Sequence, residues 1–209
     1  MAEQTTHIRR RRKAARPGEI VAAGMAEFAE KGFAAARLDD IARRAGVVKG
    51  TLYLYFDSKE ALFKEAVRAQ VLPSIAGLES LAAGFEGPTE ALIEAVIREL
   101  YAEMVEGDAR AILRILVAEG ARFPEIIDFY YEEVVSVAER ILLSLLERGV
   151  ARGEFRGGPI LDAQLVVIGP AIAAAIWRLT FEHARPLDLD AYCKAHLDVM
   201  LAGLRKTPA

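Results

Sequence analysis

Apolar residues recur three and four positions apart through most of this chain, and this spacing constrains the fold more than any other feature. Val21, Met25 and Phe28 follow it, and the same intervals return in every later periodic stretch. No segment alternates apolar and polar residues with the β-branched content typical of a strand. Gly-Pro and similar pairs, such as Gly87-Pro88, separate the periodic stretches. The sequence therefore predicts an all-α fold of about nine helices.

Charge is divided unevenly along the chain. Residues 1–68 carry 14 Lys+Arg against 9 Asp+Glu, a balance of +5, whereas residues 69–209 carry 13 against 21, a balance of −8. The net charge of −3 hides this asymmetry. A basic beginning on an acidic remainder is typical of a protein that meets phosphates at one end only.

Several classes of protein are disfavoured. Cys193 is the only cysteine and the three histidines are not at ligand spacing, so we expect no disulfide and no metal. There is no paired acid and base, no oriented nucleophile and no phosphate-binding Gly loop, which argues against an enzyme with or without a cofactor. The apolar run Leu165–Trp177 is shorter than the about 20 residues of a membrane span. We expect a cytoplasmic protein with no membrane segment.

The stretch Leu38–Ala45 predicts a short helix, and Lys49–Phe56 predicts a second one. Gly46 between them can adopt a positive φ without strain. Val47 and Leu52 would fill the angle between the two helices. Two short helices joined by a glycine-containing turn are typical of a helix-turn-helix, whose second helix enters the major groove of DNA.

Residues 32–63 resemble the signature of the TetR family, with matches at IA, AGV, GTLY, YF and SKE. The stretch ARFPEIIDFYYEEV is more weakly similar to the regulatory half of AcrR- and AefR-like members. The resemblance implies a DNA-binding transcriptional regulator with three parts: a basic arm (residues 1–16), a three-helix DNA-binding domain (17–63) and a ligand-binding and dimerisation domain (64–209).

The resemblance also assigns roles to single residues. Lys49 and Tyr53 would reach base edges, and Tyr55 and Lys59 would reach phosphate. The expected DNA-binding set is Arg37, Lys49, Gly50, Thr51, Tyr53, Tyr55 and Lys59. Tyr53 and Tyr55 could instead be packing aromatics, and the run Arg9–Lys13 is either a solvated tail or an arm that follows DNA.

The residues that begin the predicted helices of the DNA-binding domain differ in their ability to cap a helix. At Lys59, free backbone N–H groups could add to the phosphate contact, with Asp57 and Glu60 as a capping box. The family usually has hydroxyl residues near Arg37 and Val48. Arg37 could reach phosphate itself but cannot cap a helix.

A protein that reads two half-sites of a palindromic operator requires two copies. The last two predicted helices, Ile160–Phe181 and about Leu189–Leu204, are the expected dimer interface. The alternative is a monomer with a buried C-terminal hairpin.

The body contains aromatic and methionine positions suited to an apolar pocket. The expected effector set is Phe63, Tyr101, Met104, Arg114, Phe129, Tyr130 and Trp177. With the resemblance, these residues lead us to expect a repressor that a small apolar or amphipathic effector releases from DNA. Any one of them taken alone is more typical of plain core, and if all of them are core the protein would bind DNA constitutively.

Overall fold

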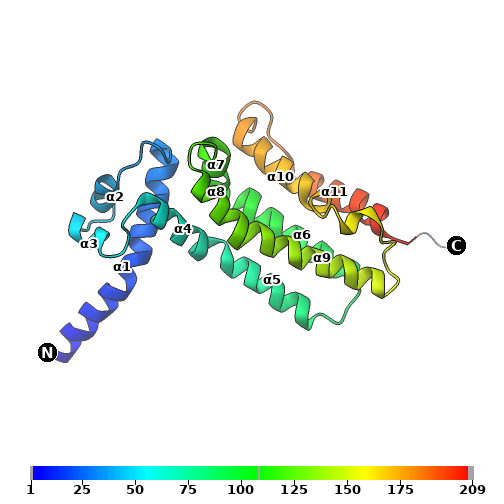
Figure 1. The fold of residues 1–209 in the computed structure, drawn as a ribbon, viewed down its shortest axis with the longest axis horizontal. Coiled ribbons are helices and arrows are strands. Elements are labelled where there is room, and N and C mark those ends of the chain that lie inside the picture. The colour runs from blue at the N-terminus through cyan, green and yellow to red at the C-terminus, as the bar shows by residue number, and fades with distance from the viewer. Residues whose placement is uncertain (1, 108, 207–209) are drawn as a thin grey trace. The chain divides into compact units, whose positions relative to one another are not determined.

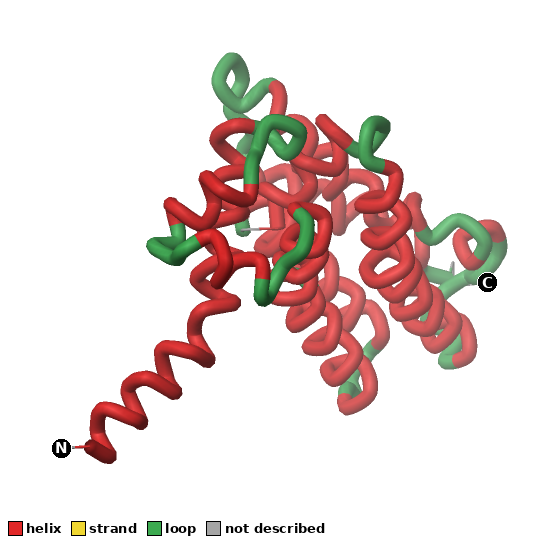
Figure 2. The backbone as a smooth tube through the Cα atoms, turned by 60° about the vertical axis from the view of Figure 1, so that its left-hand side comes forward, coloured by secondary structure: helices red, strands yellow, loops and turns green. Residues whose placement is uncertain are grey.

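The computed structural model describes residues 2–107 and 109–206, with side chains from residue 17 onward. The described residues form helices and no strand, so the all-α prediction is confirmed (Figures 1 and 2). The helices are α1 (Ala2–Lys31), α2 (Leu38–Arg44), α3 (Lys49–Tyr53), α4 (Lys59–Gln70), α5 (Leu72–Gly84), α6 (Thr89–Leu100), α7 (Ala109–Glu119), α8 (Pro124–Tyr130), α9 (Ser136–Ala151), α10 (Leu165–Thr180) and α11 (Leu189–Leu204). The π-helical segments η1 (Tyr101–Glu106) and η2 (Tyr131–Val135) continue α6 and α8, and η3 (Pro159–Leu161) is a 3-10 turn.

Two compact units make up the chain. The head unit contains residues 1–69 and 115–130, and the body unit contains residues 70–114 and 131–209. The sequence-based boundary after residue 63 therefore falls inside α4. Residues 115–130, which we had assigned to the second domain, pack with the head. Linear reasoning misses this segment because it lies far along the chain from the residues it covers.

The core of the head unit is built from α1, α2, α3 and α4. Ile20, Phe28, Ile41, Leu52 and Leu62 are buried there. At Gly32 the backbone takes a φ of +79°, and its N–H donates to the Phe28 carbonyl at 2.9 Å, which ends α1 as expected. A side chain at Gly24 would collide with Leu62, so the missing Cβ lets α4 cross α1 closely.

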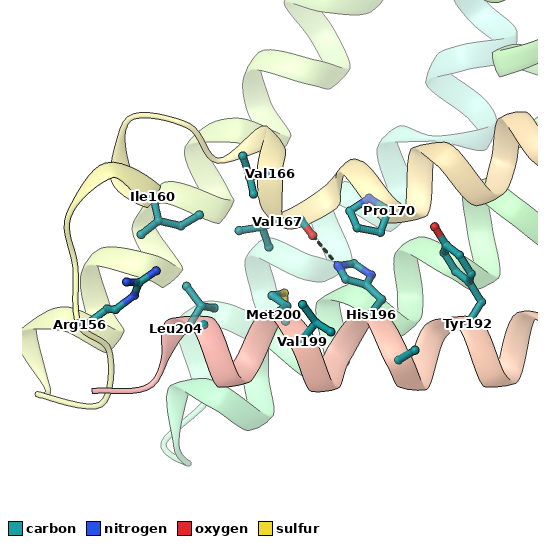
Figure 3. A pocket seen from close by; sticks show the side chains of 12 residues that line it. Arg156, Ile160, Val166, Val167, Pro170, Tyr192, His196, Val199, Met200 and Leu204 are labelled. Carbon is teal, nitrogen blue, oxygen red and sulfur yellow. Dashed lines mark hydrogen bonds between the residues drawn. The ribbon is translucent and has the colours of Figure 1, made fainter. Parts of the chain in front are cut away.

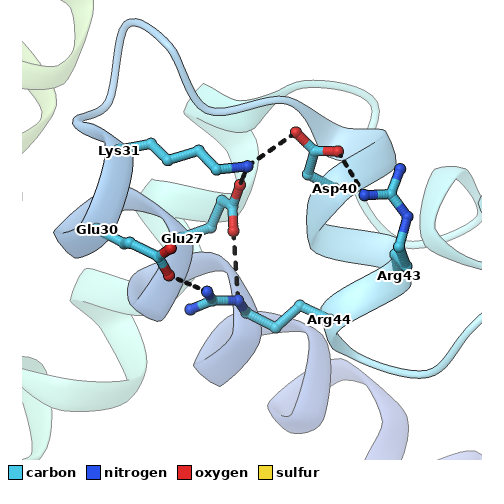
Figure 4. A network of polar contacts seen from close by, with 6 residues as sticks. All are labelled: Glu27, Glu30, Lys31, Asp40, Arg43 and Arg44. Carbon is cyan, nitrogen blue, oxygen red and sulfur yellow. Dashed lines mark hydrogen bonds and ion pairs between the residues drawn. The ribbon is translucent and has the colours of Figure 1, made fainter.

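An ion-pair network joins α1 to α2 (Figure 4). The carboxylate of Glu27 is almost fully buried and lies 2.5 Å from the Lys31 ammonium and 3.3 Å from the Arg44 guanidinium. Lys31 also reaches Asp40 at 3.1 Å, and Arg44 reaches Glu30. The buried charge on Glu27 is thus matched by two cations that are themselves half exposed, and α2 is held against α1.

The body unit has one apolar core, which α6, α9, α10 and α11 share. The buried polar side chains among the described residues of this unit are Thr89 at the start of α6 and His196 on α11. The Nδ1 atom of His196 lies 3.2 Å from the Tyr101 hydroxyl, and its Nε2 atom lies 2.9 Å from the Val167 carbonyl oxygen. Burial raises the pKa of Tyr101, which keeps the hydroxyl protonated and able to donate, and it lowers the pKa of His196.

Two predicted helices differ from the observed ones. The predicted helix Ile160–Phe181 begins at Leu165, because Gly157 and Gly158 have positive φ values of 68° and 91° and only a 3-10 turn follows them. The second helix of the predicted helix-turn-helix, Lys49–Phe56, ends at Tyr53 instead of Phe56. Leu189–Leu204 is confirmed as predicted.

Candidate nucleic-acid interface

The turn between α2 and α3 has the geometry that its sequence predicted. Gly46 has a φ of +65°, its N–H donates to the Arg43 carbonyl, and Val47 N–H donates to the Ala42 carbonyl at 3.0 Å. Leu52 is fully buried beneath α3, and Val47 is half-buried beside it. The turn geometry and the burial of Leu52 therefore fix which side of α3 faces outward.

The outward face of α3 is opposite Leu52. Successive helix residues are about 100° apart, so Gly50 and Leu54 lie farthest from the buried side, with Tyr53 next to them. Leu54 is 82% exposed and Tyr53 is 45% exposed. A Cβ at Gly50 would meet no atom within 4 Å. The face combines an aromatic ring, an apolar tip and a bare backbone, and it can approach a nucleic acid closely.

Lys49, at the start of α3, is paired but available. Its Nζ atom lies 2.8 Å from an Asp39 carboxylate oxygen and 5.6 Å from the centroid of the Tyr53 ring. The hydrogen bond with Asp39 raises the pKa of Lys49, so the side chain stays charged. Both partners are exposed, and such pairs contribute little to stability. Lys49 can therefore exchange Asp39 for a phosphate or a base edge.

Lys59 has a different position from the one we expected. Its ammonium donates to the backbone carbonyls of Phe33 and Ala34 at 2.8 and 2.9 Å. It also lies 4.9 Å from the centroid of the Phe33 ring and 5.0 Å from that of Phe123. Two of the three N–H donors of the ammonium are thus bonded inside the head unit, and two aromatic rings flank its charge. Lys59 thus fastens the α1–α2 loop to α4 and to the segment at Phe123, instead of presenting its charge to phosphate.

The start of α4 also corrects the sequence analysis. The Ser58 hydroxyl accepts a hydrogen bond from the Ala61 N–H at 3.0 Å, so Ser58 is the capping residue and the Asp57–Glu60 box is wrong. A hydroxyl directly before Lys59 was the signal that we overlooked. Arg37 and Val48 precede α2 and α3 with no side-chain cap, as expected.

The remaining predicted DNA-binding residues include both exposed and half-buried side chains. Arg37 and Tyr55 are exposed, and Thr51 is half-buried with its N–H bonded to the Val48 carbonyl at 2.8 Å. Sequence reasoning missed the exposed apolar side chains of Val48 and Leu54 as candidates for contact with a thymine methyl group. The position of Leu54, about 200° from Leu52 on the helical wheel, could have revealed it, whereas Val48 precedes α3 and has no such signal. The side chains of Arg9–Lys13 lie outside the described residues.

The predicted effector residues do not form one site. Phe63, Phe129 and Tyr130 belong to the head unit, and the other four belong to the body unit. Phe63 is core, and Phe129 is covered by the cations of Lys64 and Arg68 at 5.2 and 5.0 Å. Arg114 and Trp177 are exposed. None of the seven lines the groove between α10 and α11 or the small apolar cavity among α5, α6, α9 and α10.

These hollows lie elsewhere in the body unit. A groove of about 490 Å³ runs between α10 and α11, with Val166 and Pro170 on one side and Val199 and Met200 on the other (Figure 3). A cavity of about 70 Å³ lies among α5, α6, α9 and α10. Leu78, Val96, Leu100, Leu142 and Ile168 are among its apolar walls, with Glu139 and Gln164 also present.

Metal sites and membrane-spanning helices are both absent from the described residues. Across the described residues there is no group of three or more His, Cys, Asp or Glu side chains that could hold a metal ion. No helix in the part of the chain with described structure has the length and apolar character needed to cross a membrane.

Comparison with known families matches the chain in two places. Residues 20–66 match the family model described as bacterial regulatory proteins of the tetR family, and residues 85–199 match a tetracyclin repressor-like C-terminal domain. The chain belongs to the TetR family. It is accordingly a helix-turn-helix transcriptional regulator and not an enzyme, as the sequence predicted.

Individual proteins of the family resemble it along most of its length. The HTH-type transcriptional repressor KstR2 of Rhodococcus jostii is 29% identical over 203 residues, which cover 92% of each chain. A TetR/AcrR-family regulator from Thermobifida fusca has a TM-score of 0.66 at 29% identity and covers 91% of this chain and 99% of its own. FadR of Bacillus subtilis, solved with stearoyl-CoA, shares the fold at a TM-score of 0.71 and 20% identity, covering 88% of this chain and 97% of its own.

Proposed function

We propose that this TetR-family protein is a transcriptional repressor that binds a palindromic operator as a homodimer and leaves it when an apolar or amphipathic effector binds the body. The observation that carries the proposal is the outward face of α3 behind the positive-φ turn at Gly46. The similarity to KstR2, which is named a repressor, supports the direction of regulation. Since its target is chromosomal DNA, the proposal includes the cytoplasmic location expected from the sequence.

In this proposal, five residues of the head divide the work on DNA. Tyr53 and Lys49 read base edges, and Gly50 allows the backbone of α3 to come near the groove floor. Arg37 and Tyr55, both exposed, bind phosphates on either side. Lys59 is a positioning residue, because its ammonium is committed to the carbonyls of Phe33 and Ala34.

The dimer is proposed to form through α10 and α11. Val166 on α10 and Val199 on α11 are 68% and 73% exposed, although the two helices share the core of the body unit. Ala173 and Ala195 on the same two helices are exposed and small, which permits close helix approach. A broad apolar surface of this kind is typical of a surface that another protein covers.

The effector is proposed to enter the cavity among α5, α6, α9 and α10. Its walls are almost entirely apolar, and its volume of about 70 Å³ holds only a few atoms. A ligand of ordinary size needs roughly 300 Å³ or more, so binding must push these helices apart. The stearoyl-CoA complex of FadR supports a long-chain amphipathic class of ligand. A tenfold change in operator occupancy requires about 1.4 kcal/mol of preference between the two states.

The DNA-binding part of the proposal is tested by selecting double-stranded DNA sequences on the purified protein, at low ionic strength and after extraction of bound metabolites. We expect an inverted repeat with half-site centres about 34–36 Å apart or a multiple of that spacing. Tyr53→Phe should change the preferred base at one position of each half-site. Binding without sequence preference would refute the proposal.

The effector part is tested with Ala138→Leu, because Ala138 lines the small cavity and extra carbon atoms would fill it. We expect the variant to bind the operator normally and to lose release by long-chain acyl compounds. Ala118→Leu, at an exposed position of α7, is the matched control. If no compound of a broad apolar panel shifts the melting temperature or releases DNA, the protein is instead a constitutive DNA binder.

A further inference from the structure

The α10–α11 surface carries both a groove and a protruding pair of aromatic rings. We propose that Trp177 and Phe181 of one copy fill the groove between α10 and α11 of a second copy, and that the second copy does the same in return. This inference rests on the proposed homodimer and specifies how the two surfaces meet. It also assigns an occupant to the groove, namely protein and not effector.

The groove is built to take an apolar occupant. Val166 and Pro170 form one wall, Val199 and Met200 form the other, and the volume of about 490 Å³ has room for several side chains (Figure 3). The one buried polar side chain in its lining, His196, has both ring nitrogens within hydrogen-bond distance of Tyr101 and Val167. The described groove therefore offers no unsatisfied buried donor or acceptor that would select a polar ligand.

The aromatic pair is ready to be buried. Trp177 is 39% exposed and Phe181 is 53% exposed, with ring centroids 5.0 Å apart. The indole Nε1 already donates to the Arg185 carbonyl at 2.8 Å. A tryptophan is costly to bury only when its N–H lacks a partner, so this ring can enter an apolar site without that penalty.

Groove and rings lie on the same side of α10. At 100° per residue, Val166, Pro170, Ala173 and Trp177 form one stripe along the helix. Ala173, which is exposed and small, stands midway. In an isologous pair of antiparallel α10 helices crossing at Ala173, residues 177 and 181 of one copy lie opposite 169 and 165 of the other. Residues 165 and 169 are the chain neighbours of Val166 and Pro170, which line the groove.

Charge at the ends of the two features agrees with this arrangement. Arg156 lines the far end of the groove, is exposed, and has no ion pair among the described residues. Glu182 directly follows Phe181 and would arrive near Arg156 of the partner when the rings enter. Burying the exposed parts of the four rings would cover roughly 400 Å², about a quarter of the ~1,600 Å² of a standard specific interface.

The experiment uses Trp177 as its own probe, because it is the only tryptophan in the chain. Sedimentation velocity gives the mass across a range of protein concentrations, and acrylamide quenching of tryptophan fluorescence is measured on the same samples. We expect dimer formation to be accompanied by emission at shorter wavelength and by quenching that is several-fold weaker than in the dilute monomer.

Two variants test the two sides of the contact. Phe181→Ala removes a ring, and Gly203→Leu fills the groove, because Gly203 is one of its lining residues; each should weaken dimerisation by about tenfold or more. Gly203→Leu should keep its helical circular dichroism, since the added side chain enters open space and leucine favours helix over glycine. Val117→Ala and Gly77→Leu, at exposed positions of α7 and α5, are the matched controls.

The outcomes separate the two proposals. A dimer whose Trp177 is quenched as readily as in the monomer, or a Gly203→Leu variant that stays fully dimeric, overturns this docking and leaves the dimer standing. A monomer at every concentration overturns the dimer itself. Shielding of Trp177 that is independent of concentration and disappears when small molecules are extracted overturns the docking in favour of a ligand.

Discussion

At the scale of single residues, Lys59 and Lys49 show how the neighbours of a lysine decide what its charge can do. We expect Lys59→Met to lower the free energy of unfolding by about 2 kcal/mol, because two charge-assisted hydrogen bonds are lost. The salt dependence of operator binding should stay unchanged. Lys49→Met should do the opposite: leave stability within about 0.5 kcal/mol and reduce the salt slope by about one unit.

Urea unfolding and operator titrations at four salt concentrations measure both quantities for each variant. A Lys59→Met protein that unfolds like the parent and loses one unit of salt slope would restore Lys59 to the phosphate contacts predicted from the sequence.

His196 provides a pH-dependent prediction at the same scale. Burial holds the pKa of His196 in the folded protein below its ordinary value of about 6.5. Below about pH 6.5 the unfolded chain therefore binds a proton that the folded protein does not yet bind. The free energy of unfolding must then decrease as the pH is lowered. His196→Gln should reduce this loss between pH 7.5 and pH 5.5.

The measurement is urea unfolding at both pH values, and His183→Gln, at an exposed position, is the control. An equal loss of stability in the parent and in His196→Gln would contradict the assignment.

At the scale of helices, α3 has only five residues and begins without a cap. The exposed side chain of Val48 holds no packing contact that a smaller residue would sacrifice, and its backbone is already extended. Val48→Ser should therefore stabilise the protein by about 0.5–1 kcal/mol through a hydroxyl cap. Thermal unfolding checks this value. Val48→Ala, which shortens the side chain equally without a hydroxyl, should not raise the melting temperature.

Sequence periodicity and turn residues were sufficient to predict the helices and the helix-turn-helix formed by α2 and α3. Gly32 and Gly46 end a helix and make a turn because only positive φ values fit there, and both were predicted. The first residues of the helices were harder to predict from the sequence. Leu165 begins α10 because residues 159–161 form a separate 3-10 turn after the paired glycines, and Ser58 caps α4 because it lies one residue nearer than the acid that we chose.

At the scale of the whole molecule, the effector residues could not be predicted from sequence. Aromatic side chains at helical spacing are equally suited to a core, a pocket or an interface, and only the three-dimensional neighbours separate these roles. Phe63 lies in the head core, whereas Trp177 lies on the body surface. The small cavity is lined mainly by aliphatic residues, which carry no signal of their own.

The basic run at the N-terminus gives a prediction for the whole protein on DNA. If Arg9–Lys13 follows the phosphates, deletion of residues 2–13 should reduce the salt slope of operator binding by about two units or more, since each neutralised phosphate contributes about 0.9. Operator titrations at several salt concentrations measure the slope. Arg140→Gln, an exposed charge on α9, is the control. An unchanged slope would identify the run as a solvated tail.

Residues 115–130 belong to the head unit, and this has a consequence for protein engineering. Phe123 packs its ring 4.9 Å from that of Phe33, and Glu119 accepts a hydrogen bond from the Ala34 N–H. A chimeric regulator made by cutting near residue 69 would lack both Phe123 and Glu119. The Phe33 ring would then lose this aromatic partner, and the Lys59 ammonium would lose one of its two rings. Transplanting the DNA specificity of this protein onto a different sensor therefore requires carrying over two separate pieces of chain, not one.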